Sequence, residues 1–217
     1  AWFDLVAGSS LQHAGKLGSF FHPADRVLFE QLSVSVHAGE LVQIAGKNGA
    51  GKSSLLRILA ALAQPEDGSL SYRQQLLPAA SSDYAANLCY IGHHSGIHEQ
   101  LTALENLSFW RAASGVAPAD DYALLAKLGL AGLEDSPCRM LSAGQQRRVS
   151  LARLWFTPCQ LWILDEPFTA LDQSAITLLQ QHFLQHLLKG GSVILTTHQS
   201  LSLDYARLTT MEIAYRW

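Results

Sequence analysis

One eight-residue segment constrains the fold of this chain more than any other feature. Residues 46–53, GKNGAGKS, match the pattern G-x-x-x-x-G-K-[ST] at every position. A short apolar run, Leu41–Ala45, precedes the segment, and an amphipathic stretch, residues 54–62, follows it. These patterns predict a strand, a glycine loop and a helix. A chance glycine loop is a poor alternative, because the motif lies in the structural context that it requires.

The chemistry of such a loop comes from its backbone. Glycines let consecutive N–H groups point at phosphate oxygens, and a helix that begins near Lys52 adds its positive N-terminal end. We expect Lys52 to reach the β- and γ-phosphates of a nucleotide and the Ser53 hydroxyl to hold Mg²⁺. The other residues expected to surround the phosphates are Gly46, Asn48, Gly49, Ala50, Gly51 and Ser54.

Two carboxylates follow a second apolar run. Residues 161–164 predict a buried parallel strand, and Asp165 and Glu166 come directly after it. Residues 192–197 predict another central strand, and the carboxyl ends of parallel strands carry the site in open α/β sheets. We expect Asp165 to bind Mg²⁺ and Glu166 to polarise the attacking water. A solvated acidic turn is the alternative for this pair, but the loop at residues 46–53 disfavours it.

A third motif, LSAGQQRR at residues 141–148, distinguishes this chain from other proteins with a phosphate-binding loop. Ser142 and Gln145 form a capping-box pattern at the start of a helix. Ala143 and Gly144 leave that helix end uncovered, which makes it a phosphate-binding surface. Because it lies in another subdomain than the loop, we expect it to serve the ATP of a second protomer. An ordinary capped helix would not explain the two small residues.

Residues 101–141 have a helical pattern and lack strong strand signals. Thr102 and Glu105 form a further capping box, and residues 119–128 predict a second helix. We therefore expect one domain, in which a helical subdomain at residues 93–141 interrupts a nucleotide-binding core formed by residues 1–92 and 142–217.

Composition excludes several classes of protein. The 217 residues are 48% hydrophobic, enough for one substantial core, and the net charge of −3 with scattered basic residues argues against nucleic-acid binding. The apolar runs are far shorter than the roughly 20 residues that span a bilayer, and the first 21 residues do not resemble a secretory signal, so we expect a cytoplasmic protein. Cys89, Cys138 and Cys159 form no CxxC pair and are expected to be buried.

In this order and spacing, the motifs resemble those of the ATP-binding subunits of ABC transporters over nearly the whole chain. The resemblance implies an α/β fold, a P-loop NTPase of ABC type, with a mainly parallel core sheet flanked by helices, a small antiparallel N-terminal sheet and a helical subdomain. It implies that Ser142, Gly144 and Gln145 close over ATP bound to the partner subunit, and that Asp172 lies in a loop at the dimer interface. It also implies that His198 contacts the γ-phosphate, although this histidine alone would more often be structural.

Two further positions of the chain concern the nucleotide site. Where the family carries a glutamine that senses Mg²⁺ and the transmembrane partner, this chain has His93. A protonated imidazole would repel Mg²⁺, so we expect a pH-sensitive activity. The family also stacks an aromatic ring on adenine from the segment ahead of the first core strand. Phe20, Phe21 and His22 are the candidates, and Phe21 is our choice.

Longer phrases resemble the ATPase of the bacterial cytochrome c maturation system, the haem exporter; they lie at residues 90–97, 101–107, 151–155, 161–172 and 196–199. This resemblance implies a homodimeric ATPase, peripheral at the cytoplasmic face of the inner membrane and docked on separate transmembrane subunits. Hydrolysis would be coupled to haem export or to release of a haem-loaded chaperone. We expect no direct haem binding: His93, His94 and His98 should face ATP and the partner, and His182 and His186 should lie on a solvated helix face.

Three other functions stay open. An ABC exporter of another substrate would share every catalytic residue. A soluble ABC-type ATPase acting on DNA ends or ribosomes usually has a coiled-coil insertion or two fused ATPase domains, which this sequence lacks. A nonhydrolytic binding module is disfavoured because Lys52, Asp165, Glu166 and His198 are all present.

Overall fold

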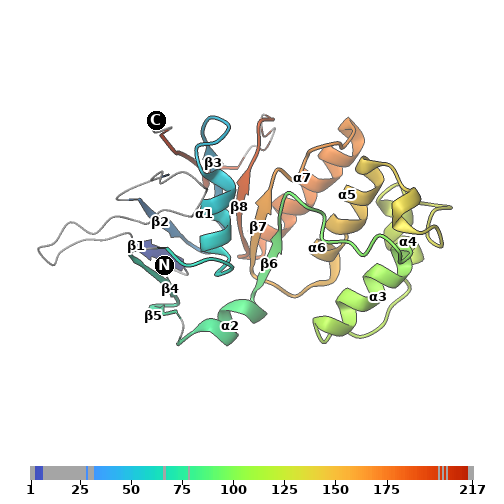
Figure 1. The fold of residues 1–217 in the computed structure, drawn as a ribbon, viewed down its shortest axis with the longest axis horizontal. Coiled ribbons are helices and arrows are strands. Elements are labelled where there is room, and N and C mark those ends of the chain that lie inside the picture. The colour runs from blue at the N-terminus through green and yellow to red at the C-terminus, as the bar shows by residue number, and fades with distance from the viewer. Residues whose placement is uncertain are drawn as a thin grey trace, which may run out of the picture.

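The computed structural model describes the backbone of residues 3–6 and, in full, residues 28, 32–65, 67–77, 79–199, 201, 203 and 205–214 (Figure 1). Phe21, the residue expected to stack on adenine, lies outside the described residues, as do Phe20 and His22. Within the described ranges, no helix has both the length and the apolar character that a bilayer-crossing segment needs.

A parallel sheet forms the centre of the fold, as expected. Its strands are hydrogen-bonded in the order β6-β7-β8-β3-β9, and each neighbouring pair is parallel. All residues of β7 and β8 are buried, which agrees with their continuous apolar sequences. The strands are β3 (Leu41–Ala45), β6 (Leu88–Ile91), β7 (Leu161–Asp165), β8 (Ser192–Thr196) and β9 (Leu208–Glu212).

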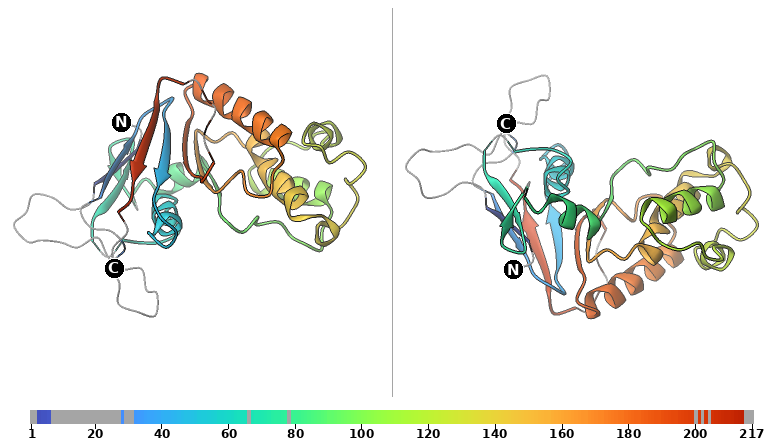
Figure 2. Two further views of the ribbon diagram at one scale, coloured as in Figure 1. Left: turned by 90° about the horizontal axis from the view of Figure 1, so that it is seen from above. Right: turned by 90° about the horizontal axis from the view of Figure 1, so that it is seen from below.

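Helices cover both faces of this sheet. Successive side chains of a strand point to opposite faces, so Ile163 and Ile194 join the apolar cluster of α1 (Lys52–Leu59), while Trp162 and Leu164 join that of α7 (Gln173–Leu188). Figure 2 shows α1 and α7 on the two sides of the sheet. The carboxyl ends of the strands therefore open at one edge between the two helical layers.

A smaller antiparallel sheet packs against the α1 side, again as expected. It has the order β2-β1-β4-β5, and β2 and β4 alternate exposed and buried residues. Val36 and Tyr72 lie in the same apolar cluster as α1. Its strands are β1 (Phe3–Val6), β2 (Ser33–Val36), β4 (Ser69–Tyr72) and β5 (Gln75–Leu76), and α2 (Ser81–Ala86) leads on to β6.

A group of helices lies on the far side of the parallel sheet from the antiparallel one (Figure 1). They share a separate apolar cluster that includes Leu107, Leu125 and Val149. A buried pair fastens two of them, since Arg111 Nε donates to Asp121 Oδ2 at 2.9 Å. The elements are α3 (Ala103–Ala113), α4 (Tyr122–Lys127), η1 (Cys138–Met140), α5 (Ala143–Leu151) and α6 (Arg153–Phe156).

The predicted helices are present, but two have other ends. The helix predicted at residues 54–62 is Lys52–Leu59, because Gly51 is its N-cap with a φ of 97° and the next residues are already helical. The helix predicted at residues 119–128 is only Tyr122–Lys127. The Asp120 carboxylate accepts the N–H of Tyr122 and so competes with an earlier helical start.

The prediction of a solvated face around His182 and His186 is wrong. The ring of His186 stacks on Trp162 with centroids 3.6 Å apart, and the ring of His182 stacks on Trp155 at 4.0 Å. His186 Nε2 also lies 3.2 Å from the Gln160 carbonyl oxygen. Burial lowers the pKa of His186 to about 4, so this side chain packs as a neutral ring.

The cysteines are free and buried, as predicted. Cys89 lies in β6, Cys138 in η1 and Cys159 just before β7. Burial raises the pKa of each thiol. In the described residues, no three histidine, cysteine, aspartate or glutamate side chains are grouped so that they could hold a metal ion, and His93, His94 and His98 form no such cluster.

Candidate functional site

The loop between β3 and α1 folds back on the lysine that follows it. Lys52 Nζ donates hydrogen bonds to the carbonyl oxygens of Gly46 at 2.8 Å and Lys47 at 3.2 Å. Gly46 has a φ of 149°, and a Cβ atom there would lie 2.8 Å from the Ile213 carbonyl oxygen. Glycine at this position therefore permits a close approach of the loop to the chain after β9.

The N-terminus of α1 has neither a side-chain cap nor an acidic residue in its first turn. Its N-cap, Gly51, has no side chain, and Lys52 and Ser53 begin the helix. The first N–H groups of any helix lack intrahelical partners, and the helix dipole places positive charge there. This helix end is thus prepared to receive an anion from outside the chain.

Asp165 and Glu166 lie at the carboxyl end of β7 and share one partner on β8. Thr196 Oγ1 donates to Asp165 Oδ1 at 2.6 Å and accepts the backbone N–H of Glu166 at 2.9 Å. Glu166 has a φ of 48°, in the left-handed region that residues other than glycine rarely adopt. Thr196 consequently fixes both the direction of one carboxylate and the backbone that presents the other.

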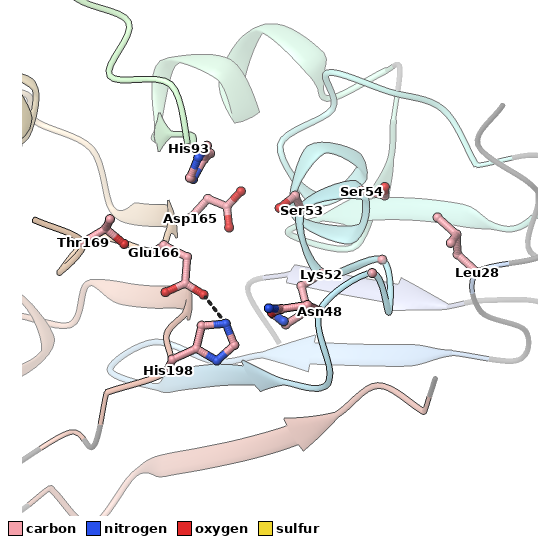
Figure 3. A pocket seen from close by; sticks show the side chains of 12 residues that line it. Leu28, Asn48, Lys52, Ser53, Ser54, His93, Asp165, Glu166, Thr169 and His198 are labelled. Atoms are coloured by element: carbon pink, nitrogen blue, oxygen red, sulfur yellow. Dashed lines mark ion pairs between the residues drawn. The ribbon is translucent and has the colours of Figure 1, made fainter. Parts of the chain in front are cut away.

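His198 approaches Glu166 from the chain that follows β8. Its Nε2 lies 3.4 Å from Glu166 Oε1, a contact drawn as a dashed line in Figure 3. The His198 side chain is 59% exposed, whereas that of Glu166 is 19% exposed. The pair leaves the imidazole accessible to a ligand while the carboxylate is largely enclosed.

A cavity of about 510 Å³ joins these groups. Lys52 and Ser53 enter it from α1, and Asp165 and Glu166 face them from β7 (Figure 3). Its lining residues are Leu28, Asn48, Gly49, Gly51, Lys52, Ser53, Ser54, His93, Asp165, Glu166, Thr169 and His198. Two residues expected around the phosphates do not line it: the Gly46 carbonyl faces Lys52, and the Ala50 N–H donates to the Lys47 carbonyl.

The donor set fits a magnesium ion. The Ser53 side chain is exposed at the start of α1, and Asp165 Oδ1 already accepts from Thr196. No hydrogen bond from the described residues reaches the other Asp165 carboxylate oxygen. Hydroxyl and carboxylate oxygens are ligands that Mg²⁺ prefers, together with water and substrate phosphates.

The capping box predicted at α5 is confirmed. Ser142 Oγ accepts the N–H of Gln145 at 3.3 Å, and Gln145 Oε1 accepts the N–H of Ser142 at 2.8 Å. Ser142 and Ala143 are exposed. Ser142, Gly144 and Gln145 are absent from the lining of the 510 Å³ cavity, so the structure does not bring them to the glycine loop of their own chain.

The loop after β7 packs tightly on the start of α5. A Cβ atom at Gly144 would lie 2.4 Å from the Ala170 carbonyl oxygen, and Ala170 has a φ of 62°. Asp172 caps α7 by accepting the Ala175 N–H at 2.9 Å, and it accepts from Arg148 Nη2 at 2.5 Å. The 59% exposure of the Asp172 side chain leaves it accessible beside α5.

A second cavity of about 300 Å³ adjoins the first. His93, Glu166 and Thr169 line both cavities, and Ala143 brings the start of α5 to the second. The other residues that line it are His94, Ser95, Glu99, Gln146, Arg147 and Ala170. His93 therefore stands between the nucleotide-sized cavity and the exposed end of α5.

Sequence reasoning did not single out Thr196 or Thr169. Thr196 is a hydroxyl residue at the carboxyl end of a central strand, directly beside β7, and that position could have indicated a partner for Asp165. Thr169 follows Glu166 in the loop after β7, where no pattern of residue types distinguishes it from an ordinary turn residue.

Comparison with known proteins gives a consistent family. The model of the family described as ABC transporter matches residues 29–169. The cytochrome c biogenesis ATP-binding export protein CcmA of Idiomarina loihiensis is 51% identical, over 96% of this chain and 94% of that protein. The protein of the same name from Shewanella sp. strain MR-7 is 47% identical, over 99% of each chain.

Solved structures agree with the fold. An ATP-binding subunit of an ABC transporter superposes with a TM-score of 0.77 and 26% identity, covering 91% of this chain and 80% of that one. A putative ABC transporter ATP-binding protein from Pyrococcus furiosus gives a TM-score of 0.75 at 19% identity, with 97% of each chain covered. The second likeness, at this identity, concerns the fold alone.

Proposed function

The chain belongs to the ABC transporter family, as one of the cytochrome c biogenesis ATP-binding export proteins, and on this premise we propose that its 510 Å³ cavity binds MgATP and hydrolyses it. The observation that carries the proposal is the cavity itself. It joins the uncapped N-terminus of α1 to Asp165 and Glu166 at the end of β7. Membership of this family makes the chain an ATP-hydrolysing subunit, and the geometry of the cavity supports the roles that we propose for single residues.

Hydrolysis transfers the γ-phosphoryl group to water and releases ADP and phosphate, so the protein's work is positioning and charge stabilisation. Lys52 and the N–H groups at the start of α1 bind the phosphate oxygens. Glu166 orients the attacking water, and His198, whose Nε2 is 3.4 Å from Glu166, contacts the γ-phosphate. Thr196 holds the Glu166 backbone while water attacks.

Ser53 and the free oxygen of Asp165 would hold Mg²⁺. When bound, the ion neutralises part of the phosphate charge. His93, at the sequence position that corresponds to the family's glutamine, lines the cavity, and its imidazole offers a nitrogen to this region. The outer residues of the nucleotide site are Gly46, Asn48, Gly49, Ala50, Gly51 and Ser54, which shape or line the loop.

Two chains act together in this proposal. Ser142, Gly144 and Gln145 do not line the cavity of their own chain, and Ser142 is exposed, so the start of α5 is available for ATP held by a partner. Asp172 would lie at the same interface. Each chain has a complete set of both surfaces, which favours a homodimer with two ATP molecules between the subunits.

The wider role is the one that the relatives' names suggest, an export protein of cytochrome c biogenesis. In our proposal the chain docks, through the helical subdomain at residues 93–141, on separate transmembrane subunits at the cytoplasmic face of the inner membrane. The core formed by residues 1–92 and 142–217 supplies the hydrolysis. Its energy drives haem export or the release of a haem-loaded chaperone. An exporter of another substrate stays the alternative, since the same site would serve it.

The enzymatic part is tested with the purified chain and two variants. Glu166→Gln should abolish MgATP hydrolysis and trap an ATP-bound dimer, seen as an earlier peak in size-exclusion chromatography with ATP. Glu134→Gln, a carboxylate outside both cavities, should behave like the wild type. Wild-type hydrolysis by Glu166→Gln would contradict the assigned role of this residue.

The transport part needs the membrane partners. The subunit is purified from gently solubilised membranes, co-purifying proteins are identified, and haem is assayed. Small membrane subunits together with a haem-binding protein would support the proposal. A different permease would leave the ATPase mechanism intact and overturn the haem assignment, and a chain without any membrane partner would favour a soluble ABC-type ATPase.

A further inference from the structure

We propose that Arg147, a residue of α5, is a positioning residue for hydrolysis, because it holds the backbone of Glu166 in place. The inference rests on the proposed role of Glu166 as the residue that orients water. It concerns a contact inside one chain, between α5 and the carboxyl ends of β6 and β7, and it needs no ligand to be formed.

The guanidinium of Arg147 donates to three backbone carbonyl oxygens. Nη1 reaches Gly92 at 2.9 Å, and Nη2 reaches Asp165 at 2.7 Å and Glu166 at 3.0 Å. Gly92 follows β6 and immediately precedes His93, whereas Asp165 ends β7. One side chain thus connects the segment that carries His93 with the segment that carries the Glu166 carboxylate, although the two are far apart in the sequence.

The Arg147 side chain is buried, which limits the positions that its guanidinium can take. Arg147 is 6% exposed, and burial lowers its pKa to about 10, although the nearby Asp165 carboxylate acts in the opposite direction. Its Nε has no hydrogen-bond partner in the part of the chain that the structure describes. Burying a charge is costly unless hydrogen bonds compensate it, and here the three carbonyl oxygens that accept from the two Nη atoms provide that compensation and determine where the guanidinium can lie.

The backbone of Glu166 is the part of the site that most needs support. Its φ of 48° costs free energy for a residue with a Cβ atom, and such a conformation persists only when its surroundings fix it. The N–H of Glu166 donates to Thr196 Oγ1 at 2.9 Å, and its C=O accepts from Arg147 at 3.0 Å and from the Thr169 N–H at 3.2 Å. Loss of Arg147 would leave the Glu166 carbonyl oxygen with the Thr169 N–H as its remaining donor, and the weaker hold would allow the Glu166 carboxylate to turn from the attacking water.

Arg148, the next residue of α5, ties the helix to a different part of the chain. Arg148 leaves the same helix in another direction, where it donates to the Leu128 carbonyl oxygen at 3.2 Å and to Asp172. Arg147 and Arg148 therefore fasten α5 to two places, the catalytic strand ends and the start of α7 beside the end of α4. A shift of α5 when its N-terminus meets a partner's ATP would be transmitted through Arg147 to Glu166.

The test compares substitutions of Arg147 with substitution of a matched arginine. Arg147→Met removes the donors, and Arg147→Lys keeps the charge but replaces the planar fork with a point charge. Arg153→Met is the control, because Arg153 also donates to a backbone carbonyl, that of Ser150 at 3.2 Å, yet it lines neither cavity. The full-length proteins are assayed for kcat and KM with MgATP and for thermal unfolding.

We expect Arg147→Met to lower kcat by about 10- to 100-fold, the effect that small misplacements of catalytic groups produce, while KM stays close to the wild-type value. Arg147→Lys should recover part of kcat. Arg153→Met should lower the unfolding temperature without a comparable loss of kcat. If Arg147→Met does not fold, the test rests on Arg147→Lys. An unfolding temperature like that of the wild type together with a lowered kcat would then support the inference.

Two outcomes would overturn the inference: a wild-type kcat in the Arg147 variants, or an equal loss of kcat in Arg153→Met. Glu166→Gln, measured alongside, separates this failure from that of the proposed function. If Glu166→Gln is inactive and both Arg147 variants are fully active, only the positioning role is wrong. If Glu166→Gln hydrolyses ATP at the wild-type rate, the assignment of Glu166 fails first.

Discussion

The two helix N-termini that we assign to ATP are built in opposite ways. The N-terminus of α1 follows a glycine, Gly51, and no side chain caps it. The N-terminus of α5 is closed by a complete capping box, in which Ser142 and Gln145 satisfy each other's backbone N–H groups. The first end lies in the cavity with Asp165 and Glu166, and the second is exposed outside it.

This difference suggests an order of events. A capping side chain stabilises a helix by about 1 kcal/mol, so α5 is stable without a ligand, whereas the start of α1 gains partners for its N–H groups only when phosphate binds. ATP should therefore bind first to α1. The exposed side of the bound ATP can then recruit α5 of a partner chain. There, the phosphate oxygens compete with Ser142 for the N–H groups at the start of the helix.

The largest expected effect is at the uncapped end. Lys52→Ala removes a charge that now reaches two loop carbonyls, so both the loop and phosphate binding lose a donor. We expect nucleotide affinity to fall by about 100-fold, since a hydrogen bond to a charged group contributes about 1.5–3 kcal/mol. Titration with a fluorescent ATP analogue measures the loss. Lys189→Ala, at the end of α7, should bind normally, and unchanged affinity of Lys52→Ala would contradict the assignment of this helix end.

A smaller but selective effect is expected at α5. Gly144→Ala would place a methyl group 2.4 Å from the Ala170 carbonyl oxygen, so α5 and the loop after β7 must separate. We expect ATPase activity to fall by about tenfold or more because this interface carries Asp172, while binding of the ATP analogue by the single chain is retained. Ala143→Gly adds no atoms and should keep most of the activity. Equal ATPase rates for the two variants would show that close packing at Gly144 is unimportant.

Substitution of the cap itself separates stability from function. Ser142→Ala should destabilise the chain by about 1 kcal/mol and also weaken ATP-dependent dimerisation. Thr102→Ala is a matched control, because Thr102 and Glu105 form the same capping box at α3, outside both cavities. It should cost similar stability in chemical denaturation but leave ATPase activity unchanged. Parallel behaviour of the two variants in both measurements would mean that the α5 cap is only structural.

The local structure of both helix ends could be predicted from the sequence. The glycine loop and both capping boxes were predictable, because their hydrogen bonds join residues close in sequence. The parallel sheet was predictable from the continuous apolar runs of β7 and β8. These features depend on local backbone chemistry and on residue type alone.

The supports of the site were not predictable in the same way. Thr196 contacts Asp165 only because β8 lies beside β7. Arg147 lies in α5, and the carbonyl oxygens that it binds lie at the ends of β6 and β7. His186 was misjudged because helical spacing shows which residues share a face but not that Trp162 covers that face. Contacts that depend on tertiary packing leave no short pattern in the sequence.

The smallest expected effect concerns the residue between the two helix ends, His93, which lines both cavities. A protonated imidazole there would oppose Mg²⁺ and a glutamine would not, so the wild-type ATPase rate should fall relative to that of His93→Gln as the solution becomes more acidic. His94→Gln is the control, because His94 lines only the second cavity. A profile that changes in His93→Gln alone would assign the sensitive charge to His93. The same profile in all three proteins would exclude His93 as its source.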